Sequence, residues 1–276
     1  MATYTVANGH LTMHQALAAA AKNPGADVID VQKDKVSPFV VKDGSVTIRG
    51  NGAEIDASRS TYGIVVEAPW VRVSGFEIHG SNGGAVVVQN HHATVSDMEI
   101  RDGFGSGIVV MRTDYATIIR NYVHDLNGPK VIAGITVWQP IEVTGYADLW
   151  ARIKIIGNTV EGIHQGGPEG FTVILDYNPM PKPYDHRAIV EDNHGSDSDK
   201  GMMAFGSDDF VFRDNVSEDV NKGGAYRFRD SAGLVENNMA IGPLGYAEIG
   251  THNDITYHGN EHIGVQEQMV DWLWFH

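Results

Sequence analysis

Two arginines, Arg227 and Arg229, are separated by a single residue, Phe228, in a short segment of strand-like composition. Side chains of a strand alternate between its two faces, so both guanidinium groups project from the same face. Guanidinium groups at this spacing can bind a carboxylate through paired hydrogen bonds. The segment therefore predicts a binding site for an acidic ligand, to which Asp230 also belongs. Simple ion pairs of the arginines with Asp230, Asp208 or Glu248 are the alternative.

Side chains that can transfer protons are found upstream of these arginines. Lys200 or His186 can act as a base, and Tyr184 or Tyr177 can act as an acid. Abstraction of the C5 proton of a uronic acid needs a base, an acid for the leaving oxygen and a cation that neutralises the carboxylate. With Arg229 as that cation, these residues match the chemistry of a lyase or an epimerase.

Carboxylates offer a second chemistry. Hydrolysis of a glycosidic bond needs two carboxyl groups about 5–9.5 Å apart. Asp176 with Asp208 or Asp209 supplies such a pair if these residues lie on neighbouring turns of a repeat. The same three carboxylates carry the oxygen ligands that calcium prefers, although no segment matches a calcium-loop consensus. Calcium is therefore the one cofactor that the residues suggest.

The aromatic residues Trp138, Trp150 and Tyr177 fall in segments that are long for connections between short strands. These segments are 125–133, 138–152, 162–170 and 175–187. Long loops on a rigid scaffold commonly carry binding residues, and aromatic rings suit the faces of sugars. We therefore expect the rings to bind an acidic polysaccharide or oligosaccharide. Packing of the rings onto the scaffold is the alternative.

A repeated sequence motif indicates the fold of that scaffold. The motif is an apolar run followed by a polar residue and Asn. Its asparagines are Asn121, Asn158, Asn193, Asn215, Asn238 and Asn260. The last four are 22, 23 and 22 residues apart, whereas the first two gaps are 37 and 35. A period near 22 with insertions is typical of a chain that coils upon itself in stacked turns. Buried amides are tolerated when each is hydrogen-bonded, so we expect an inward ladder, with Phe76 and Met98 at the same position in earlier coils.

A second repeat, Gly followed by alternating apolar residues, predicts one short strand in each coil. Alignment of these strands predicts a row of outward side chains that forms the floor of a groove along the rod. The predicted row is Glu67, Gln89, Arg112, Gln139, Asp176, Ser207, Arg229 and Thr251 or His252.

The ends of such a stack expose unpaired strand edges and need covers. Residues 11–22 have good helix propensity and are expected to cover the N-terminal end. The apolar face of this helix holds Met13, Ala16, Leu17 and Ala20. We predict one domain over 1–276, with the cap and first strands in 1–44, the coils in 45–263 and a C-terminal cap in 264–276.

The G-[IVM]-x-V and x-[DN]-N repeats resemble those of the right-handed parallel β-helix proteins of the pectate-lyase-like superfamily. The resemblance covers roughly residues 45–263, and the opening from Tyr4 to Ile29 is similar to the capping start of secreted bacterial members. It implies an all-β fold, a single-stranded right-handed parallel β-helix of about nine coils with an N-terminal capping α-helix. The segment Tyr-Asp-His-Arg at 184–187 is loosely similar to the Asp/His/Tyr sets of β-helix mannuronan epimerases.

The resemblance does not choose a reaction, because the superfamily includes lyases, epimerases, hydrolases, phage tailspikes and adhesins. Together with the candidate residues it predicts a lyase or C5-epimerase that acts on a uronate-containing glycan. A glycoside hydrolase with paired carboxylates and a non-catalytic carbohydrate-binding, adhesin or tailspike-type rod are the alternatives.

Composition argues against several other classes. The net charge of −15, from 35 acidic and 20 basic residues, argues against a nucleic-acid partner, which needs a basic surface. No segment approaches the run of about 18 apolar residues that spans a membrane. The absence of cysteine excludes disulfides and thiolate metal sites. The first residues lack the pattern of a classical signal peptide, while the resemblance implies a secreted or extracellular protein.

Overall fold

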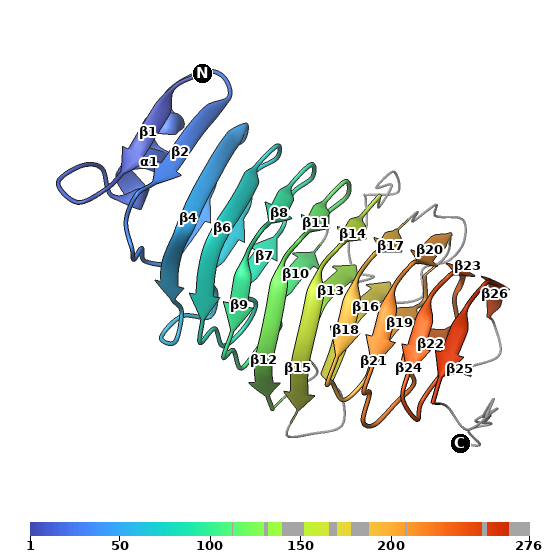
Figure 1. Ribbon diagram of the computed structural model, residues 1–276. Coiled ribbons are helices and arrows are strands. Elements are labelled where there is room, and N and C mark those ends of the chain that lie inside the picture. Colours follow the sequence, from blue (N-terminus) through green and yellow to red (C-terminus); the bar gives the residue numbers. More distant parts are fainter. Residues whose placement is uncertain are drawn as a thin grey trace.

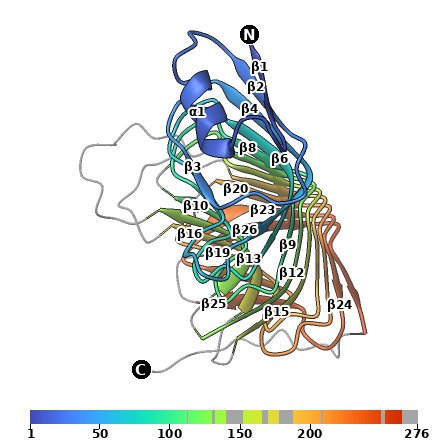
Figure 2. The ribbon, with the colours of Figure 1, turned by 90° about the vertical axis from the view of Figure 1, so that its left-hand side faces the viewer.

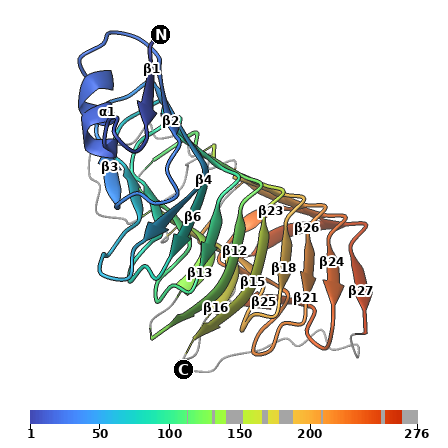
Figure 3. The same ribbon diagram turned by 60° about the vertical axis from the view of Figure 1, so that its left-hand side comes forward.

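The computed structural model describes residues 1–111, 113–129, 132–139, 152–165, 170–177, 188–207, 209–249 and 253–264. Over these residues the chain winds into a rod of stacked strands, with a short helix at its N-terminal end (Figure 1 and Figure 3). The strand pairings are parallel and join each strand to its equivalent in the next turn. The predicted all-β parallel β-helix with an N-terminal capping helix is therefore confirmed.

One wall of the rod is sheet B, which has nine strands among the described residues. They are β3 (Phe39–Val41), β5 (Ile64–Val66), β7 (Val86–Val88), β10 (Ile108–Met111), β13 (Ile132–Gln139), β16 (Gly170–Tyr177), β19 (Met202–Phe205), β22 (Tyr226–Arg229) and β25 (Tyr246–Ile249). The register is even from coil to coil: Val66 lies opposite Val88, and Val88 lies opposite Val110.

The rest of the rod is sheet A, which has 18 strands among the described residues and is bent into two limbs. The first limb holds β1 (Thr3–Val6), β2 (Asp27–Val31), β4 (Val46–Asp56), β6 (Arg72–His79), β8 (Thr94–Ser96), β11 (Thr117–Ile119), β14 (Lys154–Ile156), β17 (Ile189–Glu191), β20 (Phe210–Arg213), β23 (Ala232–Glu236) and β26 (Asp254–His258). The second limb holds β9 (Glu99–Arg101), β12 (Tyr122–Gly128), β15 (Thr159–Gln165), β18 (His194–Ser196), β21 (Val216–Glu218), β24 (Met239–Ile241) and β27 (Glu261–Ile263). Strands β4 and β6 continue from one limb into the other, since β6 pairs with both β8 and β9.

Asparagine side chains join successive coils at the bend of sheet A. The Nδ2 group of Asn193 donates to Oδ1 of Asn215 (3.0 Å), and that of Asn215 donates to Oδ1 of Asn238 (2.8 Å). The same two oxygens accept the backbone N–H groups of Asn193 and Asn215. Asn215 Nδ2 also donates to the carbonyl of Val190 (2.9 Å). Each buried amide is therefore hydrogen-bonded on both sides.

This ladder continues from Asn121 to Asn260. In the preceding coils Phe76 and Met98 fill the same buried position. The predicted inward ladder is confirmed, and it sets the register of the coils on both sides.

The residue before each ladder asparagine has a left-handed backbone conformation, as in Asp192 (φ 54°), Asp214 (φ 55°) and Asn237 (φ 53°). Asp, Asn and Gly adopt this conformation most readily, which explains the x-[DN]-N form of the repeat. Arg120 (φ 53°) is an exception, and its guanidinium is held by Asp97 of the previous coil through two hydrogen bonds of 2.8 and 2.9 Å.

Inward side chains fill the rod with one continuous apolar core. In β22 the side chains of Tyr226 and Phe228 are fully buried in this core, whereas Arg227 is half-buried and Arg229 is exposed. The two arginines therefore share the outer face of sheet B, as their spacing predicted.

The N-terminal end of the core is covered by α1 (Met13–Ala20). The helix begins with a capping box, in which Thr12 and Gln15 each accept a hydrogen bond from the other's backbone N–H. The residues that contact the core are the predicted ones, Met13, Ala16, Leu17 and Ala20. The predicted cap is thus confirmed, and it is shorter than 11–22.

Strands β1 to β3 already belong to the stack, so the parallel pairing starts before residue 45. The C-terminal cap predicted for 264–276 lies outside the described residues, except for Gly264. Within the described part of the chain, no helix is long and apolar enough to cross a membrane.

Replacement of Asn215 by Leu is expected to lower the free energy of unfolding by about 3 kcal/mol or more, because Val190 O and the N–H of Asn193 lose their buried partners. Urea denaturation measures the change. Asn221→Ala is the matched control, since Asn221 is exposed in the same coil and we expect less than about 0.5 kcal/mol. Equal stability of the two variants would contradict a structural role for the ladder.

Candidate functional site

Side chains on the outside of sheet B form rows along the rod, because its strands are in register. One of these, the outer row, lies near the ends of successive strands. It consists of Met111, Trp138, Asp176, Phe205 and Arg229. Each coil advances the row by about 4.8 Å, which is close to the length of one sugar residue in an extended chain.

The predicted row is correct at Asp176 and Arg229, and Glu67 and Gln89 directly follow β5 and β7 at the same position. It is wrong on three other strands, and Thr251 and His252 lie outside the described residues. The register places Met111, Trp138 and Phe205 where Arg112, Gln139 and Ser207 were expected. Ser207 is fully buried in the turn after β19. The glycine that precedes each strand does not fix the outward position, because the strand starts are irregular. For example, the N–H of Thr172 lies between the carbonyls of Lys200 and Gly201 (3.2 and 3.3 Å). The distance from the glycine to the outward position therefore differs between coils.

Asp176 is a partly buried carboxyl group in the middle of the outer row. Burial raises its pKa above the usual range of an aspartate, because the charged form loses hydration. A carboxyl group that keeps its proton longer than usual is suited to act as an acid.

Arg229 lies two coils beyond Asp176, and its guanidinium covers the ring of Phe205 between them, with Cζ 4.9 Å from the ring centroid. Its Nε lies 3.6 Å from Oδ2 of Asp230. The side chain of Arg229 remains half exposed. The outer row thus offers an aromatic ring, a carboxyl group, a second ring and a cation on four successive strands.

A second basic group, centred on Lys200, lies at the opposite strand ends of sheet B, and Arg227 extends toward it from the position two residues before Arg229. Lys200 precedes β19 and is buried, with Nζ 5.1 Å from the ring centroid of Phe171. A methyl group built on Gly223 would lie 2.9 Å from Cγ of Lys200 and 3.3 Å from Nη1 of Arg227. The two basic side chains therefore meet above Gly223, where a larger residue would displace them.

An apolar cluster separates the two groups on the outer face. Its buried members are Ala133, Phe171, Ile174 and Met203, and Phe205 packs against them. Trp138 adds a ring that is 39% exposed. The floor of the site is thus apolar and aromatic, and its charged groups stand at the two edges.

Several predicted site residues are not described. Trp150, Tyr184, His186 and Asp208 lie outside the described residues, and Tyr177 is described in its backbone only. Their predicted roles are therefore not tested.

Asp209 lies in the turn before β20 with a left-handed backbone (φ 57°). Within the described ranges, no three His, Asp or Glu side chains are arranged to hold a metal ion. Because Asp208 falls outside those ranges, calcium binding by Asp208 and Asp209 stays a prediction.

The sequence reasoning missed a buried carboxylate beside Lys200. The side chain of Asp199 is 3% exposed and pairs with Nζ of Lys222 (2.9 Å), and Nδ1 of His164 lies 3.6 Å from it. The 22-residue spacing of Lys200 and Lys222 matches the repeat, and it could have indicated that Lys222 lies one coil beyond Asp199 and Lys200. This ion pair between the buried carboxylate and the half-exposed Lys222 lies at the edge of sheet B that carries Lys200.

A stack of aromatic rings in the turns after sheet B was also missed. Trp70, His92 and Tyr115 all have left-handed backbones and stack with centroids 3.8 and 4.6 Å apart. Arg152 lies over Tyr115, with Cζ 5.7 Å from the ring centroid. Their spacings of 22 and 23 residues follow the repeat and would have revealed the stack. It stands along the side of sheet B on which the outer row lies.

Because the folded state raises the pKa of Asp176, the carboxylate lowers stability once the pH rises above the ordinary range of an aspartate. Asp176→Asn is therefore expected to raise the free energy of unfolding at neutral pH. The gain should vanish at about pH 3, where the wild-type group is protonated in both states. Urea denaturation at both pH values measures it, with exposed Asp254→Asn as the control. A loss of stability at neutral pH in Asp176→Asn would show that the carboxylate is favourably paired.

Solved structures with the same fold span almost the whole chain. An alginate lyase from Paenibacillus sp. str. FPU-7 is 15% identical, with a TM-score of 0.57 over 96% of this chain and 99% of that protein. The pectate lyase Pel9A is 11% identical, with a TM-score of 0.55 over 94% and 78%. A GH136 lacto-N-biosidase from Eubacterium ramulus is 11% identical, with a TM-score of 0.61 over 95% and 68%. At these identities the likeness shows the fold alone.

A comparison with curated protein sequences gives no significant match. The family described as the right handed beta helix region matches residues 31–169, which is half of the chain. The match covers coils from β2 to the end of β15, whose stacked strands and buried ladder have the geometry that this family name describes. The chain belongs to the right-handed β-helix family.

Proposed function

We propose that the protein is a polysaccharide-active enzyme, a lyase or C5-epimerase that acts on a uronate-containing glycan at the outer face of sheet B. The observation that carries the proposal is the order of groups on three successive coils. Asp176 stands on β16, Lys200 at the start of β19, and Arg227 and Arg229 on β22. The acid and the pair of guanidinium groups thus lie within about two coil steps, or ~10 Å along the rod, whereas Lys200 stands five residues from the outer row, or ~16 Å along the strand direction.

The arginines would hold the carboxylate of the sugar. Their Cα atoms are two residues apart on the outer face of one strand, so a carboxylate between them accepts hydrogen bonds from both guanidinium groups. Neutralisation of this carboxylate stabilises the negative charge that develops when the C5 proton leaves. Phe205 and Trp138 would support the sugar rings on either side.

In the lyase reaction, the amine of Lys200 accepts the C5 proton. The electron pair left at C5 forms the C4–C5 double bond as the C4–O bond breaks, and an acid gives its proton to the leaving oxygen. Lys200 lies five residues before the position of Phe205, opposite Asp176, so the two groups are ~16 Å apart along the strand direction and do not act at the same bond. With Lys200 as the base the acid is Tyr184 or Tyr177, and with Asp176 as the acid the base is His186. In the epimerase reaction, a proton returns to the opposite face of C5 and the C4–O bond stays intact. His186 as the base and Tyr184 or Tyr177 as the acid remain the other candidates for these steps.

The raised pKa of Asp176 also favours a second candidate, glycoside hydrolysis. There Asp176 would protonate the leaving oxygen, and a second carboxylate such as Asp209 would activate water or attack the sugar. Products distinguish the two reactions, because elimination leaves an unsaturated sugar that absorbs near 235 nm whereas hydrolysis leaves none. A carbohydrate-binding rod without catalysis would give neither product.

Two of the structures with the same fold are named as lyases of alginate and pectate, which are both polymers of uronic acids. This supports the lyase proposal as a chemical precedent on the fold. Such polymers occur outside cells, so we also propose an extracellular location. Assays with added calcium and with a chelator test the proposed calcium dependence.

Arg229→Ala is expected to lower kcat/KM on the uronate polymer by about 100-fold, or about 2.7 kcal/mol of transition-state stabilisation. Absorbance near 235 nm measures elimination, and proton NMR measures epimerisation. The melting temperature should stay unchanged, because the guanidinium is half exposed.

Arg72→Ala is the control, since Arg72 is an exposed arginine on sheet A, away from sheet B. Full activity of the Arg229→Ala protein would remove Arg229 from the site. A lowered melting temperature with normal specific activity would assign it to stability.

A further inference from the structure

A cavity of about 640 Å³ lies at the N-terminal end of the outer face of sheet B. Its floor is formed by Val40 of β3 and Val65 of β5, which point outward from the first two strands of the sheet. The helix α1 contributes His14 and Leu17 to the opposite wall. The cavity is thus continuous with the face that carries the proposed active site.

The helix closes this end of the face. Met13 and Ala16 on one side of α1 are buried in the core, so the helix is fixed across the end of the rod. Figure 2, which looks along the rod from its N-terminal end, shows α1 in front of the coils and close to β3. The helix and the cavity therefore lie where a glycan along the outer face would reach the N-terminal end of the rod.

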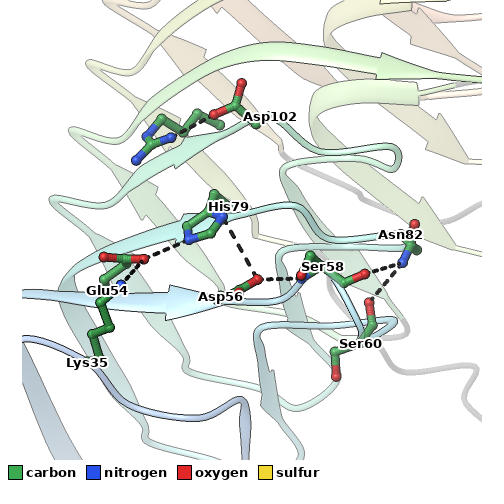
Figure 4. A network of polar contacts seen from close by, with 9 residues as sticks. Lys35, Glu54, Asp56, Ser58, Ser60, His79, Asn82 and Asp102 are labelled. Carbon is green, nitrogen blue, oxygen red and sulfur yellow. Dashed lines mark hydrogen bonds and ion pairs between the residues drawn. The ribbon is translucent and has the colours of Figure 1, made fainter.

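A well-ordered polar network fixes the other wall, the turn of residues 57–63. Asn82 Nδ2 donates to the carbonyls of Ser58 and Ser60, and the N–H of Ser58 donates to Asp56 (Figure 4). This turn presents Tyr62 to the cavity, with 43% of its surface exposed. The aromatic wall is therefore held in place before a ligand arrives, which lowers the entropy cost of binding.

The groups in the cavity suit one acidic sugar. Tyr62 and the two valines offer surfaces for a sugar ring, Lys42 with His14 offers donors for a carboxylate, and Asp43 lines the same cavity and offers an acceptor for sugar hydroxyls. Lys42 follows β3 and lies at the position where the outer row begins. A chain bound at Arg229 would therefore reach Lys42 along one straight row.

We propose that this cavity binds the terminal uronate residue of the glycan, so that the protein acts at a fixed distance from a chain end. The proposal rests on the proposed function, because it places the reacting sugar near Asp176. From β5 to β16, which carries Asp176, sheet B advances four coils, or about 19 Å, which is the length of about four sugar residues. The products are therefore short and of nearly uniform length.

Calorimetry with galacturonate and mannuronate oligomers of increasing length tests the cavity without turnover. Affinity should rise until an oligomer spans from Lys42 to Arg229 and then stay constant. Lys42→Ala and Tyr62→Ala should each weaken binding of the spanning oligomer about tenfold at unchanged melting temperature. Lys42→Arg and Tyr62→Phe should restore most of the affinity. Lys22→Ala is the control, because Lys22 is exposed next to the same helix but outside the cavity.

The product pattern provides the second readout. The wild type should release one short product length from its first turnovers, and Lys42→Ala should release a mixture of lengths.

The outcomes separate this proposal from the proposed function. Binding that depends on Lys42 and Tyr62, without any cleavage, supports the cavity and contradicts the proposed reaction. Equal affinity of the wild type, Lys42→Ala and Tyr62→Ala overturns the cavity proposal even where cleavage is normal. The absence of binding for every oligomer overturns both.

Discussion

The arrangement of groups on the surface of this protein depends on the hydrogen-bonded ladder of buried asparagines. An amide buried without partners would cost more than the contacts around it provide, so each asparagine must meet the next at a fixed height and position. The longer spacings of 37 and 35 residues between Asn121, Asn158 and Asn193 leave this contact unchanged, with amide distances of 2.9 Å in both cases. The ladder therefore keeps the same strand register between neighbouring coils, although the loops of these coils differ greatly in length.

A fixed register has consequences on the outside of the rod. Equivalent positions of neighbouring coils stack, so the same outward slot becomes a continuous row, and rings such as Trp70, His92 and Tyr115 meet face to face. The rigid core also holds charged groups in partly or fully buried places. Asp176 is held in a partly buried place that disfavours its charge, and the buried side chain of Lys200 meets Arg227 above Gly223. Such groups are expected where a protein gives up stability for binding or chemistry.

The period of the repeat was sufficient to predict the fold, the ladder and the outward direction of Arg227 and Arg229. These features follow from the spacing of residues of one type, which is visible in the sequence. The neighbours across coils were harder to predict, because they depend on where each strand begins. The outward position lies six residues after Gly170 but four residues after Gly201, so Phe205 and not Ser207 follows Asp176 in the row. The contact of Asp199 with Lys222 joins two neighbouring turns; the 22-residue spacing of Lys200 and Lys222 marks these turns as neighbours, but the side-chain pairing follows only from the three-dimensional register.

The central claim is that the outer face of sheet B binds an acidic glycan. A crystal structure of the protein with a bound uronate oligosaccharide tests it most directly. The account predicts that the sugar chain follows the outer row from Trp138 to Arg229, with one carboxylate between Arg227 and Arg229. Sugar bound on sheet A, or a chain on sheet B whose carboxylates avoid both arginines, would contradict it.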